Sequence, residues 1–361
     1  MNSATKTITS HGGDIIATAR QLGCRIDELI DMSSNLTPFG MAPGLREALI
    51  DRLDEIAFLP EIGSETLCRF FDEKYGLNGC RVFAGSGTTE FIFAIPAAFQ
   101  SKKAVIVNPT YSDYLLACKW AGVQTIRFDL KPEENFVLDL GRLRKSLTGG
   151  ELVFLCNPNN PTGVLTASAQ LHECISSHPD TMFVVDESYL PFTSEPSLLK
   201  FSVPDNLLLL RSFSKIYGMP GLRLGFLITS ETNAPAMMNR RKPWEVNRMA
   251  QIAGEFLLQK ADEYIQDVQR FIASEVKIFV EGLSVLPDIE VVPGAANFIL
   301  SRLNGPISAS VLRERMLDKK IMIRNCDNFT GLDHRYFRVS LKDQENNKVC
   351  RNALQEILGN R

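Results

Sequence analysis

Short apolar runs that alternate with longer helical stretches dominate the sequence from about residue 80 onward. The runs that predict strands are 104–107, 125–128, 152–155, 182–185, 207–210 and 223–228. Most of them are unbroken series of apolar residues, which is typical of strands covered on both faces. Strands and helices alternating at this spacing predict an α/β fold with a mostly parallel sheet. Because ligands of such sheets bind at the carboxyl ends of the strands, the loops after these runs are where functional residues are expected.

A smaller α/β portion follows, after a long helical stretch at about 246–283. Its predicted strands lie near 289–292, 297–301, 321–324 and 336–341, and two early helices are predicted at 14–22 and 43–56. A chain of 361 residues exceeds what one hydrophobic core usually serves. We therefore predict a large domain at 45–245, a small C-terminal domain at 246–361, and an N-terminal arm at 1–44 that joins the small domain.

Composition excludes several classes of protein. The net charge of −3 gives no general reason to bind nucleic acid or an anionic membrane. No stretch reaches the roughly 18 apolar residues of a membrane span, and the first residues lack the apolar core of a signal peptide. The eight cysteines form no Cys-x-x-Cys pair and have no histidine at metal-ligand spacing. We expect a cytoplasmic protein with reduced thiols, no metal, and no nucleic-acid or membrane partner.

Two of the loops after predicted strands are rich in turn-forming residues. Residues 84–90 form a Gly- and Thr-rich turn that runs into the apolar helix 91–99. Such a turn offers backbone N–H groups and the positive end of the helix dipole to a phosphate, although Gly and Thr also cap helices for structural reasons alone. Residues 156–163 must turn sharply, and their asparagines either satisfy that turn or face a ligand.

Two other loops carry isolated charges at strand ends. Asp186 follows the run 182–185, and a carboxylate there is costly unless it has a partner. A protonated ring nitrogen of a cofactor is one such partner, and an arginine or a helix cap is the ordinary one. Lys215 follows the run 207–210, where desolvation and nearby cations can remove its proton and make it a nucleophile for carbonyls. A single lysine of this kind is more often a solvated surface charge.

Together, these loops match the needs of an aldehyde cofactor that carries a pyridinium ring and a phosphate. Their order and spacing resemble the aspartate aminotransferase superfamily, the fold-type I enzymes that use pyridoxal 5'-phosphate (PLP). The resemblance covers essentially the whole chain. It implies the PLP-dependent transferase fold, with a mostly parallel seven-stranded sheet in the large domain, and a homodimer with shared active sites.

The resemblance also implies a role for each matching residue. Lys215 matches the lysine that holds PLP as a Schiff base, and Asp186 the carboxylate that keeps the pyridine nitrogen protonated. Asn160 and Tyr189 match the pair that hydrogen-bonds the phenolic oxygen of the cofactor, and Tyr111 matches the ring that stacks on it. Lys215, Asp186 and Tyr189 are thus the implied catalytic residues. The positions that match the phosphate site are Gly87, Thr88, Thr89, Ser212, Ser214 and Arg223.

Stretches outside these motifs are most similar to threonine-phosphate decarboxylases of cobalamin biosynthesis, and next to histidinol-phosphate aminotransferases. These stretches are 11–13, 31–35, 38–40, 242–247, 323–326, 331–333 and 335–338. They contain His11, Asn35, Arg324 and Arg338, donors suited to a phosphate and a carboxylate. With Asn160, these residues are implied to bind the substrate, with Arg338 on the α-carboxylate. Without the resemblance, His11 reads as a terminal residue and Arg324 equally well as part of a surface ion pair.

The implied reaction is decarboxylation of L-threonine O-3-phosphate to (R)-1-aminopropan-2-ol phosphate for the cobalamin nucleotide loop. L-serine O-phosphate is also possible, because one methyl group changes binding by only about 1 kcal/mol. The alternatives are a histidinol-phosphate-type aminotransferase and, from another class, a PLP-binding regulator without catalysis. Decarboxylation and transamination differ in whether the carboxylate or the hydrogen on Cα stands perpendicular to the cofactor ring.

One position departs from these families. They usually carry a tyrosine whose hydroxyl reaches the cofactor phosphate across the dimer interface, and Leu59 stands there in this chain. Either that phosphate contact is lost or another hydroxyl replaces it. The expectation that a partner subunit completes the site is weaker for this reason.

Overall fold

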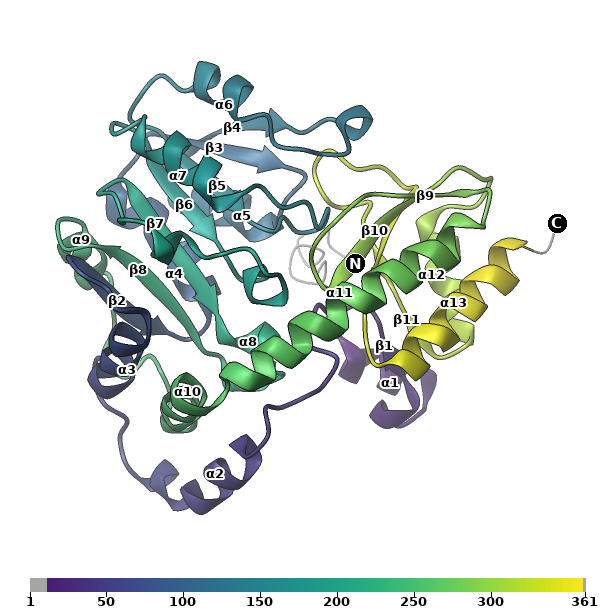
Figure 1. The fold of residues 1–361 in the computed structure, drawn as a ribbon, viewed down its shortest axis with the longest axis horizontal. Coiled ribbons are helices and arrows are strands. Elements are labelled where there is room, and N and C mark those ends of the chain that lie inside the picture. The colour runs from purple at the N-terminus through teal and green to yellow at the C-terminus, as the bar shows by residue number, and fades with distance from the viewer. Residues whose placement is uncertain (1–11, 360–361) are drawn as a thin grey trace, which may run out of the picture.

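The computed structural model describes residues 12–359, and its largest feature is a seven-stranded sheet in the order β2-β8-β7-β6-β5-β3-β4 (Figure 1). Its strands are β2 (Cys80–Gly85), β3 (Lys103–Asn108), β4 (Gln124–Asp129), β5 (Leu152–Cys156), β6 (Met182–Asp186), β7 (Leu207–Ser212) and β8 (Gly225–Ser230). The pairs from β7 through β6, β5 and β3 to β4 are parallel, and β8 is antiparallel to both of its neighbours. The predicted seven-stranded, mostly parallel sheet is confirmed.

Helices cover both faces of this sheet, as the unbroken apolar strands required. The helices of the large-sheet region are α3 (Glu65–Tyr75), α4 (Thr88–Phe99), α5 (Ser112–Trp120), α6 (Leu140–Ser146), α7 (Ser168–Ser176), α8 (Phe213–Ile216) and α9 (Ala234–Met238). Successive residues of β7 point into different cores. Leu208 and Leu210 pack with α4 and α5, whereas Leu207 and Leu209 pack with α3 and α7. Each strand therefore buries side chains on two sides.

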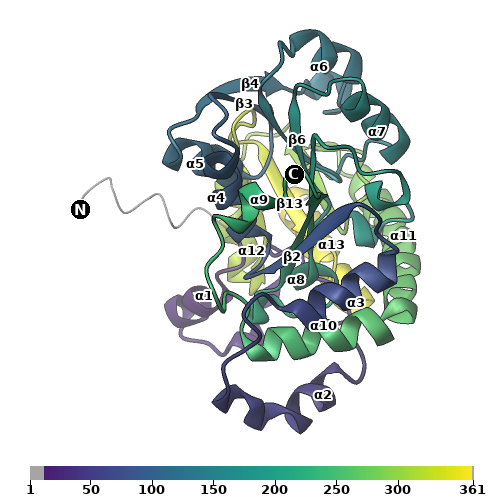
Figure 2. The same ribbon diagram turned by 90° about the vertical axis from the view of Figure 1, so that its left-hand side faces the viewer.

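The predicted helical stretch at 246–283 consists of two helices, α10 (Arg248–Lys260) and α11 (Asp262–Ser284). They are separated at Ala261, whose backbone leaves the helical region. Asp262 and Glu263 in the first turn of α11 favour a new helix start there, because acidic side chains stabilise a helix N-terminus. The break lets α10 pack beside α2 and α3, while α11 runs from the side of the large sheet to the smaller one (Figures 1 and 2).

The smaller sheet has the order β12-β13-β10-β9 and is antiparallel throughout. Its elements are β9 (Ile289–Val291), β10 (Phe298–Leu303), α12 (Ala309–Asp318), β12 (Arg324–Asn325), β13 (Tyr336–Ser340) and α13 (Gln344–Gly359). The predicted strand at 321–324 is divided between two sheets. Its first part, β11 (Ile321–Met322), pairs in parallel with β1 (Ile30–Asp31) of the N-terminal region, which takes the hydrogen bonds that would have extended the small sheet.

The N-terminal region contains α1 (Ile15–Leu22) and α2 (Leu45–Asp51), with short 3-10 turns at Ile26–Glu28 and Leu53–Ala57. The predicted helix at 14–22 is confirmed, with the Asp14 carboxylate accepting from the backbone of Ala17 at 3.1 Å. Residues 33–37 pass between the two sheets. The backbone N–H of Thr37 donates to the carbonyl of Lys215 at 3.0 Å, and that of Ser340 donates to Met32 at 2.8 Å. The domain boundaries at 44/45 and 245/246 stay predictions.

Two further properties bear on function. Within residues 12–359, no helix combines the length and apolar character needed to cross a membrane. Over the same range, no group of three or more His, Cys, Asp or Glu side chains gathers as metal ligands would.

Candidate active site

A cavity lies at the carboxyl ends of β5, β6 and β7. Every predicted cofactor residue except Gly87 lines it. The lining residues are Thr88, Thr89, Tyr111, Tyr114, Cys156, Asn160, Asp186, Ser188, Tyr189, Ser212, Ser214, Lys215 and Arg223. Residues far apart in the sequence thus meet at one edge of the sheet, as the strand-end rule predicts.

The glycine-rich turn forms one end of this cavity. Gly87 has φ of +80°, and a Cβ on it would lie 2.4 Å from the guanidinium of Arg223. A Cβ on Gly225 would lie 2.5 Å from the backbone nitrogen of Thr88. Only glycine at these two positions lets the start of α4, with its free N–H groups and positive dipole end, lie against Arg223. This arrangement suits a phosphate.

Asp186 lines the cavity and is only 5% exposed. Its carboxylate accepts the Tyr114 hydroxyl at 2.8 Å and the Ser188 backbone N–H at 2.9 Å. Burial raises the pKa of Asp186, while the hydrogen bonds from Ser188 and Tyr114 lower it. A buried carboxylate held in this way suits a cationic N–H such as that of a pyridinium ring.

Lys215 lies in α8, directly after β7, and is half-buried at the floor of the cavity. Burial, helped by the charges of Arg223 and Arg338, lowers the pKa of Lys215 to about 8. A substantial fraction of its amine is therefore neutral near physiological pH. A neutral amine is the form that attacks an aldehyde carbon.

These groups together fit PLP. The cavity offers an anion site at the Gly87 turn, a carboxylate at the position of Asp186 and a nucleophilic amine at Lys215. When bound in such a site, PLP supplies an electron-withdrawing ring that stabilises negative charge on the Cα of an attached amino acid. The residues of the chain would bind this cofactor, orient it and set the protonation states of the groups around its ring.

Tyr189 and Asn35 form the boundary between this cavity and the smaller sheet. The Asn35 amide donates to the Tyr189 hydroxyl at 3.2 Å and accepts from the Ser340 hydroxyl at 2.5 Å. Burial raises the pKa of Tyr189 to about 12, so its hydroxyl keeps its proton at neutral pH. The Tyr189 ring packs edge-on against Phe298, with ring centroids 5.0 Å apart.

Arg338 of β13 faces the same boundary and is 4% exposed. Its guanidinium donates to the side-chain oxygen of Asn160 and, at 2.9 Å, to the carbonyl of Ser33. It also lies 5.1 Å over the ring of Phe298. Within residues 12–359 the Nε of Arg338 has no acceptor. Arg338 thus joins the cofactor loop at Asn160 to the N-terminal segment at Ser33.

Arg324 is the cross-strand neighbour of Arg338 in the β12–β13 register. It donates to the Asn325 carbonyl at 2.6 Å and to Asn328 at 2.7 Å. Burial lowers the pKa of Arg324, because a charge is less stable away from water. Directly paired residues share one face of a sheet, so two guanidinium groups stand together where the small sheet meets the cavity.

The predicted substrate residues are thus only partly brought together. Asn35 and Arg338 contact the cavity residues Tyr189 and Asn160, and Arg324 lies one strand further out. His11 lies outside the described residues.

Three lining residues were not predicted: Tyr114, Cys156 and Ser188. Tyr114 was detectable, since it lies three residues after Tyr111 and such spacing puts two side chains on one face of a helix. Cys156 ends β5, and Ser188 lies two residues after Asp186, so both follow from the strand-end rule.

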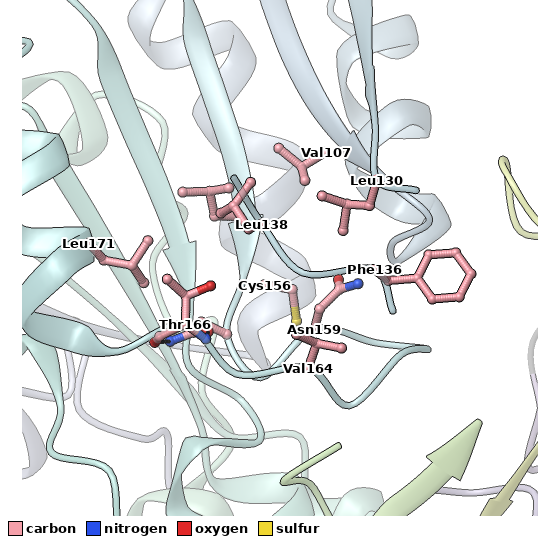
Figure 3. A pocket seen from close by; sticks show the side chains of 11 residues that line it. Val107, Leu130, Phe136, Leu138, Cys156, Asn159, Val164, Thr166 and Leu171 are labelled. Carbon is pink, nitrogen blue, oxygen red and sulfur yellow. Dashed lines mark hydrogen bonds between the residues drawn. The ribbon is translucent and has the colours of Figure 1, made fainter. Parts of the chain in front are cut away.

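A second, smaller cavity of about 20 Å³ lies beside Cys156 (Figure 3). It is lined by Val107, Leu130, Phe136, Leu138, Leu155, Cys156, Asn157, Asn159, Val164, Thr166 and Leu171. Its walls are mostly apolar, and its volume suits about one water molecule. It is a packing gap behind the 156–163 loop, too small for a substrate.

Comparisons with known proteins agree with this geometry. The family described as aminotransferase class I and II matches residues 27–354. A threonine-phosphate decarboxylase from Salmonella typhimurium is 33% identical over 356 residues, which are 97% of each chain. The solved histidinol-phosphate aminotransferase from Clostridium acetobutylicum is similar with a TM-score of 0.86 and 28% identity, over 92% of this chain and 100% of that one. The solved L-threonine-O-3-phosphate decarboxylase from Porphyromonas gingivalis is similar with a TM-score of 0.84 and 27% identity, over 92% of this chain and 100% of that one.

The match covers most of the chain and includes every motif from the glycine-rich turn to Arg338. The fold and the resemblance expected from the motifs are confirmed. This chain belongs to the class I and II aminotransferase family, whose enzymes depend on PLP.

Proposed function

We propose that this chain is a decarboxylase that converts L-threonine O-3-phosphate to (R)-1-aminopropan-2-ol phosphate. The observation that carries the proposal is the pair of guanidinium groups, Arg324 and Arg338, on neighbouring strands beside the cavity. Two like charges side by side repel each other, and a ligand with two anionic groups relieves that repulsion. A phosphorylated amino acid has such a pair in its phosphate and its carboxylate. The identity of 33% to a protein named threonine-phosphate decarboxylase supports the same choice.

The roles within the cavity follow from the chemistry of each group. We assign the cofactor phosphate to the start of α4 and to the hydroxyl and guanidinium groups beside it. The residues of that set are Gly87, Thr88, Thr89, Ser212, Ser214 and Arg223. Asp186 holds the proton on the ring nitrogen, Asn160 and Tyr189 hold the phenolic oxygen, and Tyr111 covers the ring.

The reaction depends on how the substrate is held. Only the bond on Cα that stands perpendicular to the cofactor ring is weakened, so the groups that hold phosphate and carboxylate select it. We assign the carboxylate to Arg338, and the phosphate to Arg324 with Asn35 and His11. Lys215 is the amine that we expect to return a proton to Cα once CO₂ has left.

A second candidate is a histidinol-phosphate-type aminotransferase. The TM-score of 0.86 to the solved enzyme from Clostridium acetobutylicum favours it. The cofactor residues would serve both reactions, because transamination also needs Lys215 and Asp186. The two candidates differ in which bond on Cα is placed perpendicular to the cofactor ring, and in the substrate, because L-histidinol phosphate has a phosphate but no carboxylate.

A substrate panel separates them. Purified protein with PLP is incubated with L-threonine O-3-phosphate, L-serine O-phosphate, or L-histidinol phosphate with 2-oxoglutarate. Evolved CO₂ and the mass of the amine product are measured, with glutamate measured in parallel. We expect CO₂ and an aminopropanol phosphate from the first substrate. Formation of glutamate without release of CO₂ would contradict the decarboxylase and favour the aminotransferase.

The phosphate assignment has its own control. Arg324→Gln should raise KM for the phosphorylated substrate by about tenfold or more, because a charge-assisted hydrogen bond is lost. Unphosphorylated L-threonine is the matched substrate, and its weak turnover should not change. An equal loss with both substrates would remove Arg324 from the phosphate site.

We also propose that the chain is a homodimer. Exposed apolar side chains gather in and after α2 and near α9, a pattern typical of a protein interface. They are Ile50, Leu53, Ile56, Phe58, Leu59, Ile62, Met238 and Trp244, with Leu59 being 75% exposed. Sedimentation velocity should give twice the chain mass, and Phe58→Asp should shift it towards the monomer. A monomeric wild-type protein would contradict the dimer.

A further inference from the structure

Glu187 and Arg211 are charged residues that adjoin cavity-lining residues in the sequence, but their side chains lie on the opposite face of the large sheet. Asp186, the last residue of β6, pairs in register with Leu210 of β7. The backbone N–H of the next residue, Glu187, donates to the carbonyl of Leu210 at 2.9 Å, which places Glu187 beside Arg211. Side chains of a strand alternate between its two faces. Leu210 packs in the core beneath α4 and α5, on the side of Asp186 and Tyr114. Glu187 and Arg211 therefore lie on the opposite face, towards α3 and α11.

On that face the two side chains form a buried ion pair. The Arg211 Nη1 donates to the Glu187 carboxylate at 2.9 Å, and their side chains are 10% and 1% exposed. Glu187 also accepts the Ser197 hydroxyl at 2.5 Å and the Leu198 backbone N–H at 2.8 Å. The guanidinium of Arg211 lies 5.5 Å from the ring centre of Tyr75. Every carboxylate oxygen of Glu187 thus has a partner, and the pair has one defined geometry.

We propose that Glu187 and Arg211 are positioning residues that fix the ends of β6 and β7 and thereby set the placement of Asp186 against Lys215. Glu187 is the residue after Asp186, and Arg211 is four residues before Lys215. The inference rests on the cofactor site alone. It holds for decarboxylation and for transamination alike.

Energetics favour a geometric role over simple stabilisation. Removing two charges from water is costly, and apolar side chains of similar volume often stabilise a core equally well. A buried pair is therefore weak support for stability in itself. Its directional hydrogen bonds do limit the relative movement of the two strand ends. Small misplacements of reacting groups are costly, since about 1 Å can change a rate by a factor of about 10².

The experiment compares three variants of the PLP-bound enzyme. Arg211→Met removes one charge, Arg211→Met with Glu187→Gln removes both while keeping the acceptor for Leu198, and Arg211→Lys keeps the charge. Arg211 lines a surface cavity of about 260 Å³, so water can reach the position and the shorter side chains need not unfold the chain. The control is Arg302→Met, which breaks the Arg302–Glu290 pair of the small sheet.

Three quantities are measured: the midpoint of the pH titration of the visible cofactor absorbance, the Kd for PLP, and the melting temperature. We expect both Met variants to move the midpoint by about half a pH unit or more and to raise Kd about tenfold. Arg211→Lys should keep the midpoint and the Kd for PLP close to their wild-type values, and Arg302→Met should change neither quantity. A fall in melting temperature with unchanged midpoint and Kd would overturn the proposal. So would an equal shift of the midpoint in Arg302→Met.

Discussion

The two sides of the cavity are built in different ways. The cofactor side consists of loops that follow successive strands of one sheet, so Asp186 and Lys215 each lie just after a recognisable apolar run. The side that we propose for the substrate, here called the substrate side, joins the N-terminal segment to β13. Arg338 donates to Ser33, and Ser340 donates to Asn35, each pair separated by 305 positions. One side is thus encoded locally and the other only by the complete fold.

The difference explains why members of one family share a cofactor and differ in reaction. A strand-end loop keeps its place as long as the sheet forms. The position of Arg338 depends on the small sheet, on the N-terminal segment and on Asn160 at once. Changes in any of these can reorient a substrate while Lys215 and Asp186 stay where they are. The following changes test that separation.

Lys215→Ala should have the largest effect, and it should remove the covalent attachment of PLP on the cofactor side while leaving the substrate side intact. Turnover should fall on the order of 10⁴-fold or more, because no other amine lines the described cavity. Absorbance spectra before and after gel filtration would show that PLP is no longer held covalently. The melting temperature of the apoprotein should change little. Visible absorbance of lysine-bound PLP in the variant would show that a different lysine carries the cofactor.

Arg338→Gln should impair mainly the substrate side. Loss of one member of a buried hydrogen-bonded set costs about 2–5 kcal/mol, so kcat/KM should fall about 10²-fold. Equilibrium dialysis should give a Kd for PLP that changes far less than kcat/KM, since Arg338 reaches the cofactor side only through Asn160 and through its charge near Lys215. The matched control is Arg335→Gln, which removes a half-buried arginine that lies three positions before Arg338 and pairs with Asp333. A loss of PLP affinity as large as the loss of kcat/KM would show that the two sides are not separable.

The pH dependence of PLP capture tests the protonation state of Lys215 on the cofactor side. With the pKa of Lys215 at about 8, the neutral amine is roughly a tenth of the total at pH 7 and predominates above pH 9. Capture of PLP by the apoprotein should therefore accelerate about tenfold between pH 7 and pH 9 and then level off. Stopped-flow absorbance measures the rate. An increase that continues past pH 10 would mean that the lysine keeps its ordinary proton affinity.

Tyr114→Phe should have the smallest effect. Its hydroxyl lowers the pKa of Asp186, so its loss lets Asp186 take up a proton at a higher pH. Activity should fall about two- to tenfold, most strongly on the acidic side of the pH profile. The control is Tyr217→Phe, which removes another buried tyrosine hydroxyl. Identical pH profiles for the two variants would contradict a role of the Tyr114 hydroxyl in setting the protonation of Asp186.

Much of the fold was predictable because the strands of the large sheet are buried on both faces. All six predicted apolar runs coincide with strands, from β3 at Lys103–Asn108 to β8 at Gly225–Ser230. Two predictions near the small sheet were wrong in detail. The stretch at 246–283 is broken at Ala261, and the run at 321–324 serves two sheets. The division of the second run depends on the distant strand β1, of which a local apolar pattern carries no trace, whereas Asp262 and Glu263 were a local signal for the new helix start.

The same limit applies to the site. The lining of the cavity by Thr88, Asp186 and Lys215 follows from strand ends and could be predicted. The bond between Asn35 and Tyr189 spans 154 positions, and that between Arg338 and Asn160 spans 178. The sequence indicated these residues only through a resemblance, because no spacing rule reaches across separate sheets. The ion pair of Glu187 and Arg211 was hidden for a different reason, since it faces away from the cavity.

The contact of Arg338 with Ser33 has a consequence for biosynthesis. A ribosome releases the N-terminal segment before β13. A nascent chain can therefore assemble the cofactor side while the substrate side still lacks one of its halves. The two sides of the cavity are therefore completed at different stages of synthesis.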